Sequence, residues 1–259
     1  MRVDPVSTQA PPLPRPVVMS QDWRDLTFVH WAVDPSTVER FMPPGVRPDV
    51  HDGASYVGLV PFRMVDAGFA DGPAVPFFGT FLETNVRLYS VGPDGRRGVV
   101  FLSLDTDRAA VVAGARAALN LPYRWAAMTH RADTVAGAVE HTYAARLRRP
   151  AGGPGAVPAR ASSRVVVRVG ERREATPLDE FLTARWGLHT RAWGASLYVP
   201  NEHPAWALHD AEVVRLDDEL VASVGLPGLV DRAPDRVAFS PGVHTRFGRP
   251  SRSPRTRPA

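Results

Sequence analysis

Lysine and cysteine are both absent from the 259 residues of this chain. A Schiff base needs a side-chain amine whose pKa can fall toward neutrality, and arginine cannot replace lysine because it stays protonated. Imine catalysis by a lysine side chain is therefore excluded. The lack of cysteine excludes disulfides, thiolate nucleophiles, and zinc or iron–sulfur centres with cysteine ligands.

Long apolar segments and cofactor-binding motifs are also lacking. No segment approaches the roughly 18 apolar residues that a membrane helix needs, and the proline-rich first 16 residues lack the apolar region of a signal peptide. We therefore expect a cytoplasmic protein that does not associate with membranes. There is no P-loop, no G-x-S-x-G and no H-E-x-x-H, and the glycine cluster at 152–155 lacks a strand–turn–helix setting. We expect no cofactor and no metal.

Positive charge is concentrated at the C-terminal end. The formal net charge is +4 and the isoelectric point is ≈ 10.1, but five arginines fall in the last stretch: Arg246, Arg249, Arg252, Arg255 and Arg257. Because these five charges exceed the net charge, the rest of the chain is nearly neutral and nucleic-acid binding is not expected. We expect the Pro/Arg/Ser tail 248–259 and the Pro-rich arm 1–20 to be disordered.

The intervening residues 21–247 are predicted to form a single domain of short strands and helices. Aromatic and β-branched runs predict strands over 26–33, 54–65, 81–89, 98–104, 134–146, 164–170, 189–199, 206–216 and 237–239. Capping residues and apolar spacing predict short helices after Asp34 (or Ser36), over 107–119, from Thr176 and from Asp217 or Asp218. There is no βαβ alternation and no repeat. We therefore expect an α+β, mostly antiparallel fold, with a large sheet or partly closed barrel and short flanking helices.

A loop rich in glycine, proline and phenylalanine is predicted over 66–79. It contains Phe69, Phe77 and Phe78, which make it unusually apolar for a loop. Such a loop either covers a pocket or packs directly on the core, and the sequence leaves both alternatives open.

The strand predicted over 81–89 has one ordinary face and one polar face. Side chains alternate along a strand, so one face carries Phe81, Glu83, Asn85, Arg87 and Tyr89. If this face points to solvent, it is an unremarkable outer surface. If it points into a barrel, it forms a pocket wall of convergent polar groups. Glu83 and Arg87 are four residues apart, too far for a tight pair on a straight strand, so each needs other partners.

Two further stretches combine arginine with aromatic residues. Trp23-Arg24-Asp25 precedes the first predicted strand, and Leu121-Pro122-Tyr123-Arg124-Trp125 follows the helix predicted over 107–119. Pro122 would end that helix and present the residues that follow it. The alternative for both stretches is a surface arginine whose stem lies along packed aromatic side chains.

These stretches together resemble the YqjF-like family, an uncharacterised group related in fold to acetoacetate decarboxylase. The resemblance is carried by WRDLTFVHWAVDPSTVERFMPPG, YVGLVPFRM, FLETNVRLY, the LPYRWAAM region, DEFLTARWGLHTR and FSPGVHTRFGRP. It covers the chain from about 21 to 250. It implies an antiparallel, cone-like β-barrel with helices at its edge and an internal pocket.

The likeness to the decarboxylase itself also assigns roles by position. Arg24 matches an arginine before the first core strand, and Glu83 matches an active-site glutamate. The Schiff-base lysine would follow Leu121-Pro122, where this chain has Tyr123. A second acid of the decarboxylase falls near Gly58-Leu59 and is missing. The resemblance therefore implies a retained pocket without the covalent step.

Three hypotheses about function follow. In the first, the pocket binds a small anionic or carbonyl-containing metabolite through Arg24, Arg87, Arg124 and Asn85. In the second, Glu83 and Tyr123 carry out acid–base catalysis of a lyase or hydratase type. In the third, the basic tail docks on an acidic partner. The sequence leaves open whether the chain forms a homo-oligomer.

Overall fold

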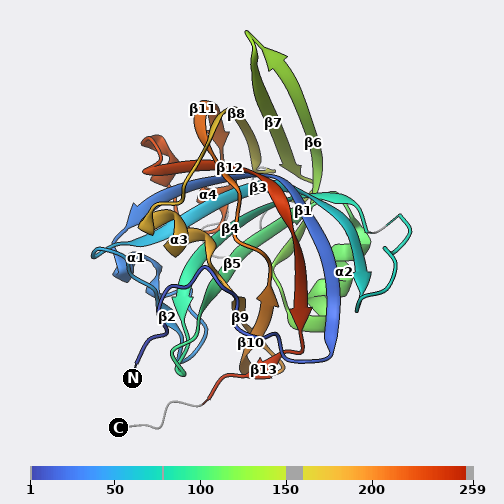
Figure 1. Cartoon of the computed structure of the whole chain (residues 1–259), viewed down its shortest axis with the longest axis vertical. Helices are drawn as coiled ribbons and strands as arrows, with labels where there is room; N and C mark the ends of the chain where they lie inside the picture. Colours follow the sequence, from blue (N-terminus) through green and yellow to red (C-terminus); the bar gives the residue numbers. More distant parts are fainter. Residues whose placement is uncertain (1, 78, 150–159, 255–259) are drawn as a thin grey trace.

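The computed structural model describes residues 2–77, 79–149 and 160–254, most of which lie in β-strands (Figure 1). The strands are β1 (Val17–Val33), β2 (Arg47–Pro48), β3 (Ser55–Phe69), β4 (Phe81–Val91), β5 (Arg97–Thr106), β6 (Tyr123–Val135), β7 (Ala138–Leu147), β8 (Ser162–Arg173), β9 (Gly187–Ala192), β10 (Ala195–Glu202), β11 (Leu208–Asp218), β12 (Arg236–Gly248) and β13 (Ser251–Arg252). The helices are α1 (Pro35–Glu39), α2 (Ala109–Leu119), α3 (Pro177–Thr183) and α4 (Leu220–Ser223), with a 3-10 turn η1 (Leu229–Asp231).

The strands form one sheet that closes on itself twice, in the order β13-β10-β9-β5-β6-β7-β8-β11-β12-β1-β3-β4-β2. Pairing of β4 with β5 closes a first ring, which also contains β6, β7, β8, β11, β12, β1 and β3. Pairing of β10 with β12 closes a second ring, which also contains β9, β5, β4, β3 and β1. Neighbours are antiparallel except where β5 meets β6 and β9. The predicted α+β, mostly antiparallel, partly closed barrel is confirmed.

Strands β12, β1, β3, β4 and β5 belong to both rings, so each of them turns one face toward each ring interior. On β4, Val86 and Leu88 pack in a cluster with Val165 and Val167 of β8, and this cluster fills the first ring. Tyr89 lies on the opposite face of β4 and packs in a cluster with Phe181 of α3, inside the second ring. The shared layer therefore separates two interiors.

Two of the short helices begin at the capping residues that the sequence indicates. The Asp34 side chain accepts a hydrogen bond of 2.8 Å from the backbone N–H of Ser36, so Asp34 caps α1 in preference to Ser36. Helix α3 begins at a full capping box in which Thr176 and Asp179 each accept from the other's backbone N–H. Because α3 is fixed at this end, its apolar residues Phe181 and Leu182 are held against the second ring.

Several strands differ from the prediction. No strand was predicted over 120–133, so β6 was missed except for its end, and β12 is much longer than the predicted strand 237–239. The single strand predicted over 189–199 is a hairpin, β9–β10, because Trp193 and Gly194 form a tight turn with positive φ values. The β6–β7 hairpin projects from the body of the molecule (Figure 1).

The loop predicted over 66–79 begins inside β3, which continues to Phe69. The side chains of Phe69 and Phe77 are 77% and 92% exposed, so neither packs on the core, and Phe78 lies outside the described residues. The alternative that these residues pack on the core is therefore wrong for the two that are described.

The predicted domain boundaries at 21 and 247 fall within regular structure. β1 begins at Val17, and β13 pairs with β10 beyond Gly248. Arg246, one of the five C-terminal arginines, belongs to β12 and forms an ion pair with Glu202. Tail residues 255–259 lie outside the described residues. None of the helices in the described ranges has the length and hydropathy to cross a bilayer.

Candidate functional site

The polar face predicted for β4 points into the second ring. β4 pairs with β3 in a continuous register, so its side chains alternate without interruption. Phe81 and Tyr89 pack in the hydrophobic clusters of this ring, and between them Glu83 and Asn85 are only 2% and 4% exposed. The structure therefore shows an enclosed polar wall rather than a solvent-facing surface.

Glu83 and Tyr123, the two residues predicted to act in acid–base chemistry, are in direct contact. The Tyr123 hydroxyl, at the start of β6, donates a hydrogen bond of 2.8 Å to Oε2 of Glu83. Burial raises the pKa of the Glu83 carboxyl from 4.5 to about 7, against the opposing effect of hydrogen bonds from Tyr123 and Asn85. Burial, with the Glu83 charge, also raises the pKa of the Tyr123 hydroxyl. At neutral pH Glu83 can therefore give or take a proton, while Tyr123 remains a donor.

Arg87 lies on the same face, further along β4. Its Nε donates to the Tyr89 hydroxyl at 3.1 Å, and its Nη2 donates to the Leu182 carbonyl of α3 at 3.1 Å. The guanidinium carbon lies 5.4 Å from the centre of the Phe28 ring. Among the described residues, no carboxylate lies within ion-pairing distance of Arg87. A charge held in this interior without a carboxylate partner can bind an anion.

Gly58 on β3 stands where a side chain would crowd its neighbours. Gly58 lies opposite Arg87 in the β3–β4 register. A Cβ atom at Gly58 would lie 3.0 Å from Nε2 of His30 and 3.3 Å from Cγ of Arg87. A side chain at this position would therefore displace both neighbours, so the glycine leaves room for the arginine.

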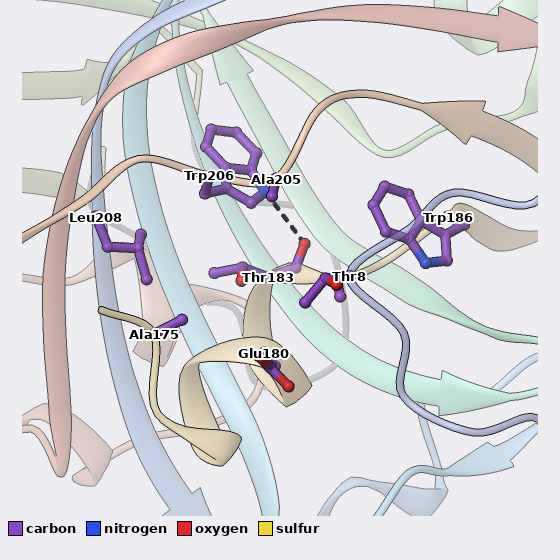
Figure 2. A pocket seen from close by; sticks show the side chains of 9 residues that line it. Thr8, Ala175, Glu180, Thr183, Trp186, Ala205, Trp206 and Leu208 are labelled. Carbon is purple, nitrogen blue, oxygen red and sulfur yellow. Dashed lines mark hydrogen bonds between the residues drawn. The ribbon is translucent and has the colours of Figure 1, made fainter. Parts of the chain in front are cut away.

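A small pocket of about 40 Å³ opens beside this site. Figure 2 shows its lining residues, two of which are joined by a hydrogen bond of 3.1 Å from Nε1 of Trp206 to the Thr183 carbonyl. The lining residues are Thr8, Ala175, Glu180, Thr183, Ala184, Trp186, Ala205, Trp206 and Leu208. They come from the N-terminal segment, from α3 and the residues on either side of it, and from the link between β10 and β11 with the first residue of β11. The pocket therefore lies at the edge of the second ring.

The N-terminal segment before β1 contributes one side of this pocket. Nε of Arg97 donates to the Asp4 carbonyl at 2.7 Å, and Nε1 of Trp186 donates to the Ser7 carbonyl at 3.0 Å. These two bonds hold the segment across the pocket, and Thr8 follows directly as a lining residue.

Two of the predicted binding residues lie outside the second ring. Arg124 follows Tyr123 on β6 and points to the opposite face, where Nε and Nη2 donate to the buried Asp105 carboxylate at 2.5 and 2.7 Å. The Arg24 side chain is 47% exposed and pairs with Asp22 at 2.8 Å. The structure therefore brings Glu83, Asn85, Arg87 and Tyr123 to one interior and places neither Arg24 nor Arg124 there.

The family model of DUF2071, described as an uncharacterized conserved protein, matches residues 20–244. The chain belongs to the DUF2071 family. The uncharacterized protein YqjF of Bacillus subtilis (strain 168) is 29% identical over 195 residues, which make up 75% of this chain and 76% of that protein. The resemblance to the YqjF-like family is confirmed.

Solved structures with the same fold include acetoacetate decarboxylase-like enzymes. The DUF2071 chain matches such an enzyme from Sphingomonas wittichii RW1 with a TM-score of 0.59 and 14% identity, over 93% of this chain and 95% of that chain. It matches the enduracididine biosynthesis enzyme MppR, complexed with pyruvate, with a TM-score of 0.58 and 16% identity, over 94% and 92% of the two chains. At these identities the likeness shows the fold alone.

Two histidines of the candidate site were not predicted from the sequence. Nε2 of His30 lies 2.5 Å from the Tyr89 hydroxyl, and His203 lies between Trp186 and Trp206, with ring centres 4.6 and 5.1 Å away. Burial lowers the pKa of His203 to about 4, so it is neutral at pH 7. The sequence offered one indication of His30, because it is a single histidine within an apolar and aromatic run. It offered none for His203, which lies in an irregular link between strands.

Unsatisfied polar atoms also mark this interior. Among the described residues, Nε1 of Trp23, Nδ1 of His30 and Oδ1 of Asn85 are buried and have no hydrogen-bond partner. Buried polar atoms are normally paired, so these three have capacity for a further partner. No group of three or more metal-ligating side chains occurs in the described parts of the chain.

Proposed function

We propose that the DUF2071 chain binds a small organic acid inside the second ring, with Arg87 holding the carboxylate. The observation that carries the proposal is the Arg87 guanidinium, which is oriented by Tyr89 and Leu182 and has no carboxylate partner among the described residues. A guanidinium has five N–H donors and matches a carboxylate in a bidentate geometry. Two of the five are used, so donors remain for a ligand.

Glu83 and Asn85 lie on the same face of β4 as Arg87, and they could form hydrogen bonds to a carbonyl or hydroxyl group of that acid. Oδ1 of Asn85 is buried and has no hydrogen-bond partner among the residues that the structure describes, and the carboxyl of Glu83, on the same face, is also buried. A protonated Glu83 can donate to a carbonyl oxygen, whereas a charged Glu83 can accept from a hydroxyl. Pyruvate, named with the MppR structure of the same fold, is an acid that carries a carbonyl.

The test is a binding titration with short monocarboxylates and 2-oxo acids, each compared with its neutral amide. We expect the acids to bind and the amides to bind at least tenfold more weakly. Arg87→Gln should weaken acid binding by about 10- to 100-fold, the range for a hydrogen bond to a charged group. Arg24→Gln is the matched control because that arginine lies at the surface. Equal affinities of the wild type and Arg87→Gln would contradict the proposal.

A second candidate function is acid–base catalysis on such an acid, favoured by the contact between Glu83 and Tyr123. A carboxyl whose pKa is about 7, hydrogen-bonded to a hydroxyl at 2.8 Å, suits proton transfer near neutral pH. A screen of 2-oxo and 3-oxo acids for turnover tests it. We expect a pH–rate profile that bends near 7 and activity that Glu83→Gln abolishes without loss of folding. Unchanged turnover in Glu83→Gln would exclude this assignment.

A further inference from the structure

Strand β6 has an edge that no other described strand covers. β5 pairs with β6 only from Tyr123 to Trp125 and ends at Thr106. From Ala126 to Val135, β6 pairs with β7 alone, and no other described backbone group bonds to this stretch. The stretch belongs to the hairpin that projects from the body of the molecule (Figure 1). Its side away from β7, here called the free edge, can therefore accept a further strand.

The backbone groups that point to the free edge belong to even-numbered residues. The Trp125 carbonyl accepts from Arg148, directly after β7, at 2.9 Å, whereas the Pro122 carbonyl accepts from Leu104 of β5 at 3.1 Å. Successive residues of a strand bond to opposite sides, and β6 pairs with β7 without a register shift. The residues whose N–H and C=O groups point to the free edge are therefore Met128, His130, Ala132 and Thr134.

Two charged side chains make the free edge complementary to itself. Arg131 and Asp133 lie on one face of β6, with 65% and 52% of their side chains exposed. In an antiparallel pair of two β6 strands, an axis at Arg131 or at Asp133 would place like charges opposite each other, which is destabilising. With the axis at Ala132, Arg131 of each copy lies opposite Asp133 of the other. At no other axis do these two residues lie opposite each other.

The same register fits the length of the free edge. It places Thr129 opposite the exposed Val135 of the second copy, a pair of β-branched side chains that suits a strand. It places Ala127 opposite Gly137 in the turn of the second copy. The overlap ends there, before Trp125, where β5 takes over the edge.

We infer that two copies of this chain associate through the free edges of β6, antiparallel and around a two-fold axis at Ala132. The sheet then continues from one molecule into the other, and the same residues serve on both sides, as in other two-fold contacts. A single pair of strands is a small contact, so we expect a Kd of about 10–100 μM. β6 belongs only to the first ring, so this inference does not depend on the proposed function.

The lack of cysteine in the chain allows the register to be measured directly. In Ala132→Cys the two new thiols would face each other across the axis, with Cα atoms about 5.5 Å apart, which suits a disulfide. In Thr134→Cys, the matched control at the same edge, they would lie four residues apart, about 14 Å along the strands. With oxidised glutathione, we expect Ala132→Cys to form a linked dimer at least tenfold faster than Thr134→Cys.

Sedimentation velocity at about 5 to 500 μM measures the association itself. We expect the dimer fraction of the wild type to rise over this range. Arg131→Asp should weaken the dimer at least tenfold, because like charges would lie opposite each other. Arg131→Asp combined with Asp133→Arg should restore it, because opposite charges meet again. Arg191→Asp, at an exposed arginine of β9, is the control for the change in net charge and should leave the dimer intact.

Three results would overturn the inference. The first is a wild type that stays monomeric over the whole range, which would leave the free edge to a different partner. The second is a dimer that Arg131→Asp does not weaken, or that the combined variant does not restore while its circular dichroism spectrum is unchanged. The third is equal rates of disulfide formation in Ala132→Cys and Thr134→Cys.

Discussion

The Glu83 carboxyl shows how burial changes the chemistry of one residue. It shares one face of β4 with Asn85 and Arg87, as the alternation of side chains along a strand predicts and as the structure shows. Removal from water disfavours the charged form, so the pKa rises from 4.5 to about 7 even though Tyr123 donates a hydrogen bond to the carboxylate. The residue that is most useful for proton transfer is therefore also one that destabilises the folded chain when charged.

This shift predicts a dependence of stability on pH. Because the folded state holds the Glu83 proton up to about pH 7 and the unfolded state releases it near 4.5, stability falls as pH rises between these values. Over pH 5 to 8 the loss due to Glu83 amounts to about 2–3 kcal/mol. The Glu83→Gln variant has no such proton, so its free energy of unfolding should not show this loss. The difference in the free energy of unfolding, variant minus wild type, should therefore increase by about 2–3 kcal/mol from pH 5 to pH 8.

Urea unfolding at pH 5 and pH 8 measures this difference. Glu171→Gln serves as the control because Glu171 is an exposed glutamate on β8, and the difference from the wild type should be the same at both pH values. If Glu83→Gln and the wild type change in parallel between the two pH values, the assigned environment of Glu83 is wrong.

Some of the site residues could be predicted from the alternation of side chains along a strand, and others could not. Glu83, Asn85 and Arg87 follow from a strand period of two, which holds because β4 has no bulge against β3. Arg124 was expected beside Tyr123 because the stretch was interpreted as a helix exit. It is the start of β6, and neighbouring residues on a strand must point to opposite faces.

At the scale of elements, β5 and β6 are joined by the buried pair of Asp105 and Arg124. β5 runs parallel to β6 at this point, with Asp105 opposite Arg124. The Asp105 side chain is fully buried and that of Arg124 is 15% exposed. Ser103 and Ser223 accept two further hydrogen bonds from the guanidinium. The pair therefore fixes β6 to β5 and to α4, and so fixes Tyr123 against Glu83.

Removal of Arg124 from its pair with Asp105 should lower the stability of the folded chain. Arg124→Met leaves the Asp105 carboxylate buried without a counter-charge, and we expect a loss of about 3–5 kcal/mol in the free energy of unfolding. Arg131→Met, on the same strand but with a side chain that is 65% exposed, should change it by less than about 0.5 kcal/mol. Denaturant titration of the two variants measures both values. Similar losses in the two would show that the buried pair has no special role.

The β9–β10 hairpin shows why turn signals can be missed. Its two turn residues, Trp193 and Gly194, have φ values of 51° and 72°, which fit a two-residue hairpin turn that usually contains Asn-Gly. Tryptophan gives no such signal in a sequence, so one long strand was predicted. The Trp193 side chain is 69% exposed, so packing offers it little compensation for the left-handed backbone.

We therefore expect Trp193→Asn to stabilise the chain by about 0.5–1 kcal/mol, because asparagine adopts positive φ more readily. Thermal unfolding followed by circular dichroism measures the change. Trp125→Asn, also at an exposed tryptophan but within strand β6, should destabilise instead. A lower melting temperature for Trp193→Asn would show that the indole contributes more than the turn geometry does.

At the scale of the whole molecule, the sheet encloses two interiors of different character. The first ring is filled by an apolar cluster, whereas the second contains the polar groups of β4 as well as aromatic side chains. Most of the strands, though not β6, could be predicted from local patterns, but the closure of the second ring could not. β10 meets β12, and β9 meets β5, through only a few residue pairs that are far apart in sequence, and no local pattern encodes such pairs.

The N-terminal segment lines the pocket but supplies no strand to either ring, since β1 begins only at Val17; only Val6 of residues 2–10 packs against the cluster of Tyr89 and Phe181. A chain that lacks residues 2–10 should therefore fold with an unchanged far-ultraviolet circular dichroism spectrum. Nε1–H of Trp186 would lose its acceptor, the Ser7 carbonyl, and its exchange with solvent, followed by NMR, should accelerate at least tenfold. Nε1–H of Trp206, bonded to Thr183, should stay protected and is the internal control. Unchanged exchange at Trp186 would mean that the segment does not cover the pocket.

The tryptophans around the second ring make the intrinsic fluorescence of the protein sensitive to this site. Trp23 and Trp206 are stacked with their ring centres 6.0 Å apart and their planes within 10°, and Trp186 lies across the pocket from Trp206 (Figure 2). Half of the six tryptophans of the chain are thus gathered around one site. Their emission depends on the dielectric and on quenchers within a few ångströms, so filling of the site can be followed by the light that the unlabelled protein emits.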